Sequence, residues 1–135
     1  MITPLPERFE SKARLASMKV WSLPKDPKMF ELAVAHKENE IVIKKNTASV
    51  FIGTNFDLMA RNAGIETIVF AGIATEIGIE SSAREALNRG YYAVVAKDAV
   101  SSSDKEAHER SLANMSKLLI VYDSKALAAE WKNSN

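Results

Sequence analysis

The pattern of apolar and polar positions changes near residue 40. From there on, short continuous apolar runs alternate with segments whose apolar residues recur every three or four positions. The short runs predict buried strands, and the helical spacing predicts amphipathic helices. The predicted strands are residues 41–43, 67–71, 91–96 and 118–122, and the predicted helices are residues 56–63, 77–89, 104–115 and 124–132.

Local signals mark several ends of these helices. Gly64 and Gly90 follow predicted helices, where a glycine supplies the left-handed residue that ends a helix. The run from Ser103 to Glu106 has the spacing of a capping box, in which the Ser103 oxygen accepts the backbone N–H of Glu106. These signals favour separate helices between the strands.

The alternation of apolar strands with amphipathic helices predicts an α/β fold. Strands that are apolar along their whole length are typical of a parallel sheet that helices cover on both faces, with right-handed crossovers. We therefore expect a three-layer, Rossmann-like arrangement.

Residues 1–39 lack this regular alternation of apolar runs and helical patterns. They carry all four prolines and many charges, and the only helical pattern that they show is at residues 28–35, just after Pro27. The stretch 18–21 is a candidate for a short extended piece. We expect a single domain over residues 1–135, made of an irregular segment at 1–39 and an α/β core at 40–135.

Composition narrows the classes of partner and compartment. The net charge of +1 gives no electrostatic support for binding nucleic acid or an anionic membrane. The absence of cysteine excludes disulfides, thiolate metal sites and a cysteine nucleophile within this sequence. No apolar run approaches the roughly 18–20 residues that span a bilayer, and the first residues lack the apolar core of a signal peptide. We expect a cytoplasmic protein.

In folds of this class, ligands bind beyond the carboxyl ends of the strands. Three predicted loops lie there, at residues 44–54, 72–78 and 97–103. Polar groups from different strands would converge at this edge, which indicates where a site could lie without identifying one.

Two of these loops carry motifs that resemble the isochorismatase-like (cysteine hydrolase) superfamily. Residues 43–54, IKKNTASVFIGT, are similar to the lysine-bearing segment of that family, and residues 72–86, GIATEIGIESSAREA, are similar to its nucleophile segment. The likeness extends over roughly residues 40–122. It implies the isochorismatase-like fold, incomplete at the N-terminus.

The resemblance also implies site residues. The family hydrolyses small substrates with an Asp–Lys–Cys triad, and Lys45 matches the family lysine because it stands six residues before Phe51; Lys44 is the alternative. Gly78 occupies the cysteine position. The backbone N–H groups of Ala74 and Gly78 match the oxyanion hole, and Ile73–Ala74 matches a peptide bond that is often cis in relatives. Ile73, Thr75 and Phe51 complete the implied ligand-binding set.

The triad aspartate has no clear counterpart. The family places it at the end of a first strand, and the 44 residues before Lys45 contain no apolar strand that ends in aspartate. Asp26 lies in a proline-rich stretch and is a poor substitute. Because glycine cannot attack a carbonyl carbon, we expect a hydrolase-like protein that retains a small-molecule pocket but lacks cysteine-dependent hydrolysis. The alternative is an active hydrolase of a small amide, carbamoyl or vinyl-ether substrate that uses water or another nucleophile.

Other polar residues near the motif have competing interpretations. Thr75, Ser81 and Ser82 are candidate nucleophiles, although hydroxyls near a helix start more often cap it. Glu76 is a candidate for activating water, although a glutamate in a first turn already suits the helix dipole. His36 and His108 lack metal-ligand spacing, so we expect no metal and no cofactor, and we expect a structural role for His108.

The number of predicted strands bears on assembly. The family builds a larger sheet than the four strands predicted here, and an uncovered sheet edge favours association. We expect a symmetric homo-oligomer that hides the edge, with Trp21 and Trp131 covering the core or an interface. The alternative is that this chain begins at an internal methionine of a longer gene.

Overall fold

The computed structural model describes residues 12–13, 26, 28, 31 and 34–133. The chain divides into two compact units, residues 1–47 and residues 48–135. The elements whose bounds the structure describes belong to the second unit. In chain order they are α2 (Phe56–Asn62), β1 (Thr67–Ile73), the π-helix η3 (Thr75–Ile79), α3 (Glu80–Asn88), β2 (Tyr92–Ser101), α4 (Lys105–Met115), β3 (Ile120–Tyr122) and α5 (Ser124–Asn133).

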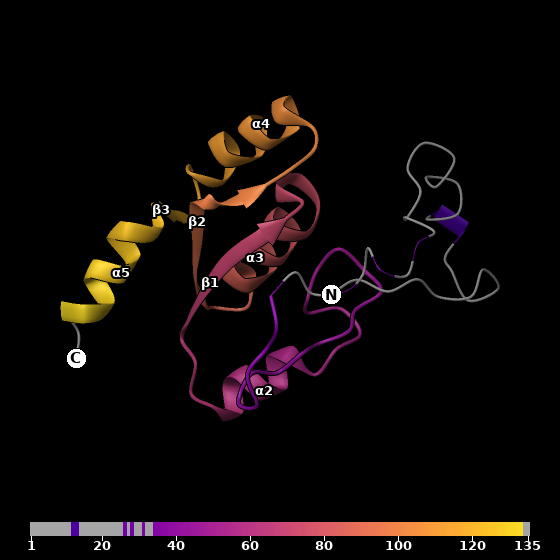
Figure 1. Cartoon of the computed structure of the whole chain (residues 1–135), viewed down its shortest axis with the longest axis vertical. Coiled ribbons are helices and arrows are strands. Elements are labelled where there is room, and N and C mark those ends of the chain that lie inside the picture. Colours follow the sequence, from indigo (N-terminus) through magenta and orange to yellow (C-terminus); the bar gives the residue numbers. More distant parts are fainter. Residues whose placement is uncertain (1–11, 14–25, 27, 29–30, 32–33, 134–135) are drawn as a thin grey trace. The chain divides into compact units, whose positions relative to one another are not determined.

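The described strands form one parallel sheet in the order β1-β2-β3 (Figure 1). The chain passes through η3 and α3 between β1 and β2, and through α4 between β2 and β3. A parallel neighbour requires such a crossover, because a tight turn can only reverse the chain. The predicted α/β class is confirmed.

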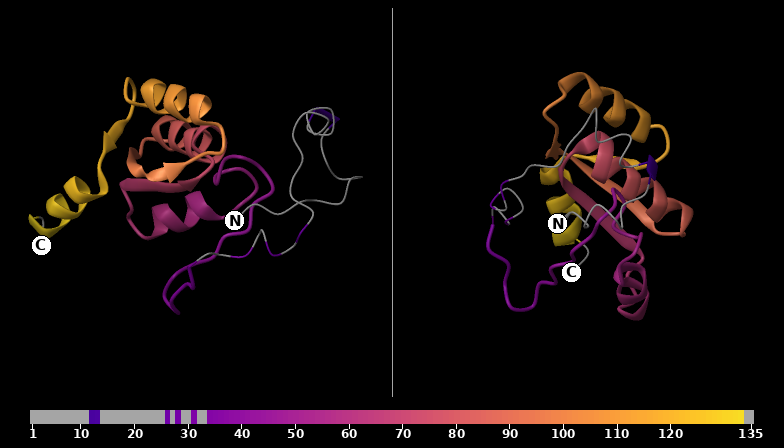
Figure 2. Two further views of the ribbon diagram at one scale, coloured as in Figure 1. Left: turned by 45° about the horizontal axis from the view of Figure 1, so that its top comes forward. Right: turned by 90° about the vertical axis from the view of Figure 1, so that its right-hand side faces the viewer.

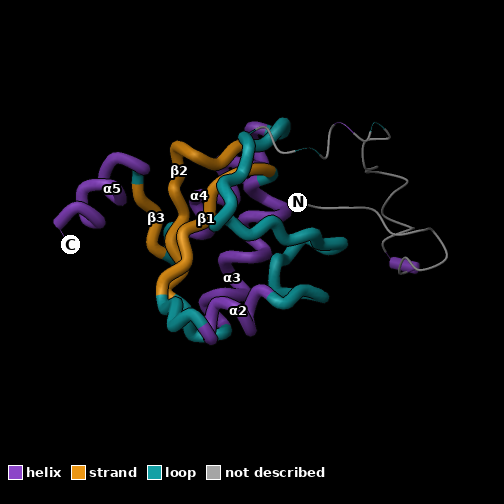
Figure 3. Tube along the Cα trace, turned by 60° about the horizontal axis from the view of Figure 1, so that its bottom comes forward, coloured by secondary structure: helices purple, strands orange, loops and turns teal. Residues whose placement is uncertain are grey.

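Helices pack on both faces of this sheet: α3 and α4 lie together on one face, and α5 contacts part of the other before it extends away from the sheet (Figures 2 and 3). On one face, α3 and α4 enclose the larger apolar cluster, which includes Ile68, Phe70, Ala83, Ala86, Val95 and Met115. On the other face, Leu127 of α5 packs against Val94 and Ala96 of β2. Alternate residues of β2 therefore serve different layers, as the pleat of a strand requires.

A bulge separates the two parts of the β1–β2 ladder. Phe70 pairs with Val95, but Gly72 pairs with Val100, so the single residue Ala71 lies opposite residues 96–99 of β2. Extra residues on one strand bend it and re-aim its side chains. The prediction of a loop at residues 97–103 is wrong for most of these residues, because β2 resumes pairing after the bulge and runs to Ser101.

The predicted strand at residues 41–43 is also wrong. No strand is assigned there, and Ile41 is 69% exposed. A β-branched triplet has the propensity for a strand, but it forms one only where a neighbouring strand pairs with its backbone. The described residues thus contain three strands rather than four.

The predicted helix ends fare differently. Gly64 and Gly90 have φ values of +67° and +89°, the left-handed geometry expected after α2 and α3. Asp104, rather than Ser103, caps α4, with its carboxylate accepting the Ala107 N–H at 2.9 Å. The helix therefore starts one residue later than the capping-box pattern predicts.

Two predictions fall wholly or partly outside the described residues. These are the extended piece at 18–21, including Trp21, and half of the helix at 28–35. Within the latter, Val34 is exposed and neither it nor Ala35 is helical. No helix in the described part of the chain is both long enough and apolar enough to cross a membrane.

Candidate functional site

The segment from Gly72 to Gly78 joins the carboxyl end of β1 to the first helical turns. Gly72 has a φ of +116°, and the peptide bond between Ile73 and Ala74 is cis, as the resemblance implies. Ile73 is 81% exposed at the end of the strand, whereas Thr75, the first residue of η3, is fully buried. The implied ligand-binding residues 73–75 and 78 therefore lie in one short stretch at the edge of the sheet where ligands bind in this class.

A single carbonyl organises the start of η3. The Ala74 oxygen accepts the N–H groups of Ile77, Gly78 and Ile79 at 3.2, 2.9 and 3.2 Å. The Gly78 N–H, which the resemblance assigns to an oxyanion hole, is therefore hydrogen-bonded within the chain in this structure. An incoming oxyanion would compete with the Ala74 carbonyl for that donor.

Gly78 differs from the other glycines in its backbone. The remaining four glycines, Gly53, Gly64, Gly72 and Gly90, have positive φ, while Gly78 lies inside the helical turns of η3. A helical backbone accepts any L-residue, so the conformation of residue 78 does not require glycine.

Two of the candidate hydroxyl nucleophiles are buried, and each is engaged in a hydrogen bond. The Thr75 Oγ1 lies 2.8 Å from Nδ1 of His108, and the Ser82 Oγ accepts the backbone N–H of Val50 at 3.1 Å. Both side chains are almost inaccessible to solvent. Attack on a substrate by either hydroxyl would require it to leave these partners, which favours a structural role.

The contacts of Thr75 belong to a clamp between α4 and the start of α3. One turn after His108 on α4, Ser111 donates to Oε2 of Glu80 at 2.6 Å, while Arg84 holds the other carboxylate oxygen at 2.8 Å. His108 and Ser111 thus fix the position of η3 from the side. Sequence patterns did not single out Ser111, whose partners are more than 30 residues away.

Glu76 lies one residue further into η3 and faces the end of β2. Its Oε1 accepts the Ser102 hydroxyl at 2.9 Å, and the Ser102 oxygen in turn accepts the Asp104 N–H at 3.2 Å. Its Oε2 is buried without a hydrogen-bond partner among the described residues. The sequence offered only the run of serines at 101–103 as an indication that Ser102 could matter. Its contact with Glu76 becomes apparent only in the folded structure, in which β2 continues past its bulge to Ser101.

Lys45 belongs to the first unit. Its ammonium donates to the Thr47 carbonyl oxygen at 2.9 Å, and partial burial holds the pKa of Lys45 below its ordinary value. A lysine whose charged form is disfavoured by burial can more readily act in proton transfer.

Phe51 lies in the core of the second unit. Its ring packs edge-on against Phe56 at a centroid distance of 5.1 Å and also contacts Tyr91, and the Arg89 guanidinium lies 5.0 Å from its centre. The aromatic ring therefore anchors the part of the lysine-bearing segment that lies in the second unit.

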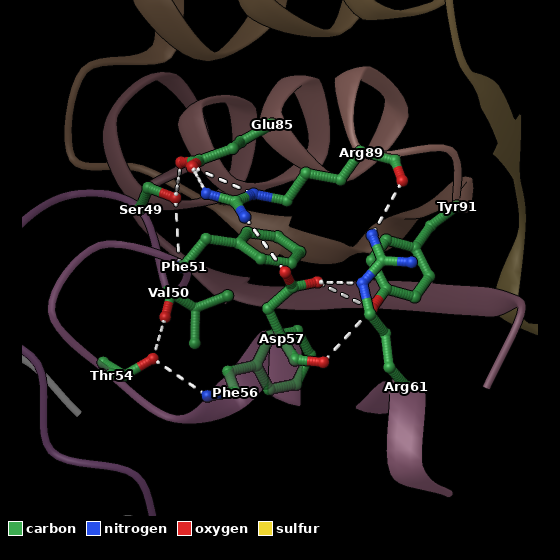
Figure 4. Close-up of polar contacts among 10 residues, drawn as sticks. All are labelled: Ser49, Val50, Phe51, Thr54, Phe56, Asp57, Arg61, Glu85, Arg89 and Tyr91. Carbon is green, nitrogen blue, oxygen red and sulfur yellow. Dashed lines mark hydrogen bonds and ion pairs between the residues drawn. The ribbon is translucent and has the colours of Figure 1, made fainter. Parts of the chain in front are cut away.

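Around Phe51, a network of charged and hydroxyl groups ties this loop and α2 to the end of α3 (Figure 4). Arg89 bridges Asp57 at 3.0 Å and Glu85 at 2.6 Å, and Glu85 also accepts the Ser49 hydroxyl. Tyr91 donates its hydroxyl to Asp57 at 2.8 Å. Because these residues lie at the end of α3 and just before β2, the network is at the amino edge of the sheet, away from Ala74 and Gly78.

The network lowers the pKa of its two carboxylic acids, Asp57 and Glu85. The Tyr91 hydroxyl, followed by the nearby arginines, holds the pKa of Asp57 below its usual value. Burial opposes ionisation of Glu85, but its bonds to Ser49 and Arg89 outweigh burial and lower its pKa. Both carboxylates are thus stabilised in the charged form, as expected for structural partners of an arginine.

Comparison with known proteins agrees with this architecture. A family model described as "Isochorismatase domain" matches residues 7–126. The uncharacterized isochorismatase family protein YwoC of Bacillus subtilis is 40% identical over 90 residues, covering 67% of this chain and 48% of that protein. The chain therefore spans about half the length of this curated relative.

A relative with a named activity and a solved structure extend the comparison. The ureidoacrylate amidohydrolase RutB of Methylobacterium radiotolerans is 36% identical over 84 residues, which are 62% of this chain and 33% of that protein. An isochorismatase-like hydrolase from Alkaliphilus metalliredigens superposes with a TM-score of 0.70 at 28% identity, over 73% of this chain and 55% of that chain. Since the family model spans most of the sequence, this chain belongs to the isochorismatase family.

Proposed function

We propose that this chain binds a small molecule at the carboxyl edge of its sheet and does not carry out the cysteine-dependent hydrolysis that the family motif implies. The observation that carries the proposal is Gly78, which stands at the position matched to the nucleophile and has no side chain. The 135 residues contain no cysteine that could replace it.

The surrounding groups support the same interpretation. The hydroxyls of Thr75 and Ser82 are buried and hydrogen-bonded, and the Gly78 N–H donates a hydrogen bond to the Ala74 carbonyl. A covalent acyl intermediate needs an exposed nucleophile with an adjacent base, and neither hydroxyl meets that requirement.

Restoring a thiol tests whether the remainder of the site is competent. We expect Gly78→Cys to hydrolyse at least one member of a panel of small amides and carbamoyl compounds on which the parent is inactive, measured as ammonia release. Ser81→Cys, which places a thiol three residues further along, is the matched control and should stay inactive. Turnover that alkylation of the new thiol abolishes would assign the chemistry to residue 78.

The parent protein provides the contrary test. Measurable turnover by the parent on this panel, lost in Lys45→Ala, would overturn the proposal of an inert chain. If Lys45→Ala shows the same turnover as the parent, the activity comes from a contaminating hydrolase. Parent and variant are therefore purified in parallel and assayed together.

The second candidate is an active hydrolase of a small amide, carbamoyl or vinyl-ether substrate that uses water or a non-cysteine nucleophile. The observation that favours it is the similarity to a ureidoacrylate amidohydrolase. Both routes leave a solvent oxygen in the product, because water also hydrolyses an acyl ester at its carbonyl carbon. A covalent route through a side chain should add the mass of the acyl group to the protein in rapid-quench mass spectrometry, whereas direct attack by water should leave the mass of the protein unchanged.

A further inference from the structure

Only one of the two oxygens of the Glu76 carboxylate accepts a hydrogen bond from the described residues. Ser102 binds its Oε1, whereas Oε2 is buried without a partner in the described part of the chain. A buried polar atom that lacks a hydrogen bond destabilises the fold, and more so when it is charged. Native proteins keep few such atoms, and each one calls for a physical explanation.

The orientation of the carboxylate is set by a chain of donors. The Asp104 N–H donates to the Ser102 oxygen, so the Ser102 hydroxyl proton is directed toward Glu76. Asp104 is itself fixed as the cap of α4 through Ala107. Oε1 is therefore held by the frame of the protein. The terminal torsion of a glutamate is broad, so a rotation about Cγ–Cδ that brings Oε2 to a ligand also moves Oε1, and the Ser102 hydroxyl would have to follow it.

The position of this oxygen matches the edge where ligands bind. Glu76 follows β1 by three residues and its partner Ser102 follows β2 directly, so the pair lies beyond the carboxyl ends of two neighbouring strands. The implied ligand-binding residues Ala74 and Gly78 are two residues away on either side. The unpartnered oxygen is thus part of the same stretch.

Charge and chemistry define what it can bind. A carboxylate oxygen only accepts hydrogen bonds, and no group of three or more metal-binding side chains occurs among the described residues. An anionic ligand group would be repelled by Glu76 and by the adjacent Glu80. We propose that Glu76 binds an N–H donor of the ligand, such as the NH₂ of a carboxamide or ureido group. This inference rests on the proposed function and adds a residue that recognises the ligand.

Binding to matched probes tests the role of Glu76. Benzamide and isobutyramide are each paired with the corresponding methyl ester, methyl benzoate and methyl isobutyrate, which lacks the N–H donor. In Glu76→Gln the side-chain amide can still accept from Ser102 but presents NH₂ in place of Oε2. We expect the affinity of the parent for the amides to exceed that of Glu76→Gln by about 10-fold or more, the usual effect of a hydrogen bond to a charged group, with the ester affinities unchanged.

A second readout does not depend on the probes. Removing a buried, half-satisfied charge should stabilise the free protein, so Glu76→Gln should raise Tm by about 3 °C or more. Glu109→Gln, which neutralises an exposed glutamate of α4, is the matched control and should leave both Tm and binding unchanged.

The outcomes separate this inference from the proposed function. Failure of the parent to bind either amide, equal loss of amide and ester binding in Glu76→Gln, or an unchanged or lowered Tm in that variant would each overturn the assignment. Amide hydrolysis by the parent would overturn the proposed function while leaving the N–H recognition by Glu76 intact.

Discussion

Gly78 is the residue that the resemblance matches to the nucleophile, and its backbone conformation does not require a glycine. It lies in the helical turns of η3, where a residue with a side chain would lose less conformational entropy on folding. The other glycines of the chain are different, since each adopts a positive φ. The backbone conformation of residue 78 therefore does not require a glycine.

This contrast gives a prediction for stability. Gly78→Ala should stabilise the protein by about 0.5–1 kcal/mol, the usual difference between alanine and glycine in a helix. Gly90→Ala should destabilise it by about 1–2 kcal/mol, because residue 90 has a φ of +89° although nothing lies within 4 Å of an added Cβ. Urea unfolding of both variants measures the two effects. A loss of stability in Gly78→Ala would mean that neighbouring atoms fill the space beside residue 78.

At the scale of elements, α3 is held at both ends by partners distant in sequence. At its start, His108 and Ser111 of α4 bind Thr75 and Glu80. At its end, Arg89 reaches Asp57 of α2. This arrangement fixes the helix that follows Gly78, so the candidate site rests on a rigid support.

The network at the end of α3 predicts a pH dependence. The folded pKa of Asp57 is lowered, chiefly by Tyr91, so its contribution to stability is fully present above the unfolded value of about 3.9 and is lost as the pH falls through the folded pKa. Tyr91→Phe should lower the urea midpoint at pH 7 and show a smaller further drop between pH 5 and pH 2 than the parent.

Tyr122→Phe serves as the control for that experiment, because Tyr122 lies on β3 and is half exposed. It should follow the parent at every pH. An acid-induced drop in Tyr91→Phe as large as that of the parent would show that another group dominates the acid transition.

At the scale of the whole molecule, α5 covers only part of one face of the sheet. Tyr92 and Tyr122 point to the same face as Val94 and Ala96, and they remain 63% and 48% exposed. Exposed aromatic residues beside an apolar strand pair are typical of protein interfaces. We propose that a second copy of the chain covers this surface.

Light scattering tests the assembly. At micromolar concentration we expect a mass that is a multiple of that of the single chain, and Tyr122→Lys should shift it to the monomer because burial of an unpaired charge is costly. Leu58→Lys introduces the same charge on α2, at an exposed residue outside this face, and should leave the mass unchanged. A monomeric parent would contradict the proposal.

Much of the architecture could be predicted from local sequence patterns. The apolar runs at 67–71 and 91–96 became β1 and β2, and Gly64 and Gly90 end helices as expected. These features depend on neighbouring residues only, so periodicity and glycine geometry suffice to detect them. The motif around Gly78 likewise indicated the family, which the comparison confirmed.

Other features depended on partners that the local pattern does not contain. The β-branched run at 41–43 forms no strand, because strand formation requires pairing with another segment. The capping pattern at 103–106 suggested Ser103, whereas the path of β2 makes Asp104 the cap. In each case the local propensity was real, and a longer-range contact decided the outcome.

The sequence by itself determined the alternation of strands and helices, the family and the absence of a thiol at residue 78, because each follows from residue type and spacing. Only the tertiary structure decided that β2 bulges opposite Ala71 and carries Ser102 to Glu76, 26 residues away, with one buried oxygen left without a partner. Strand register and hydrogen-bond completeness are properties of segments brought together by folding, and no local pattern encodes them.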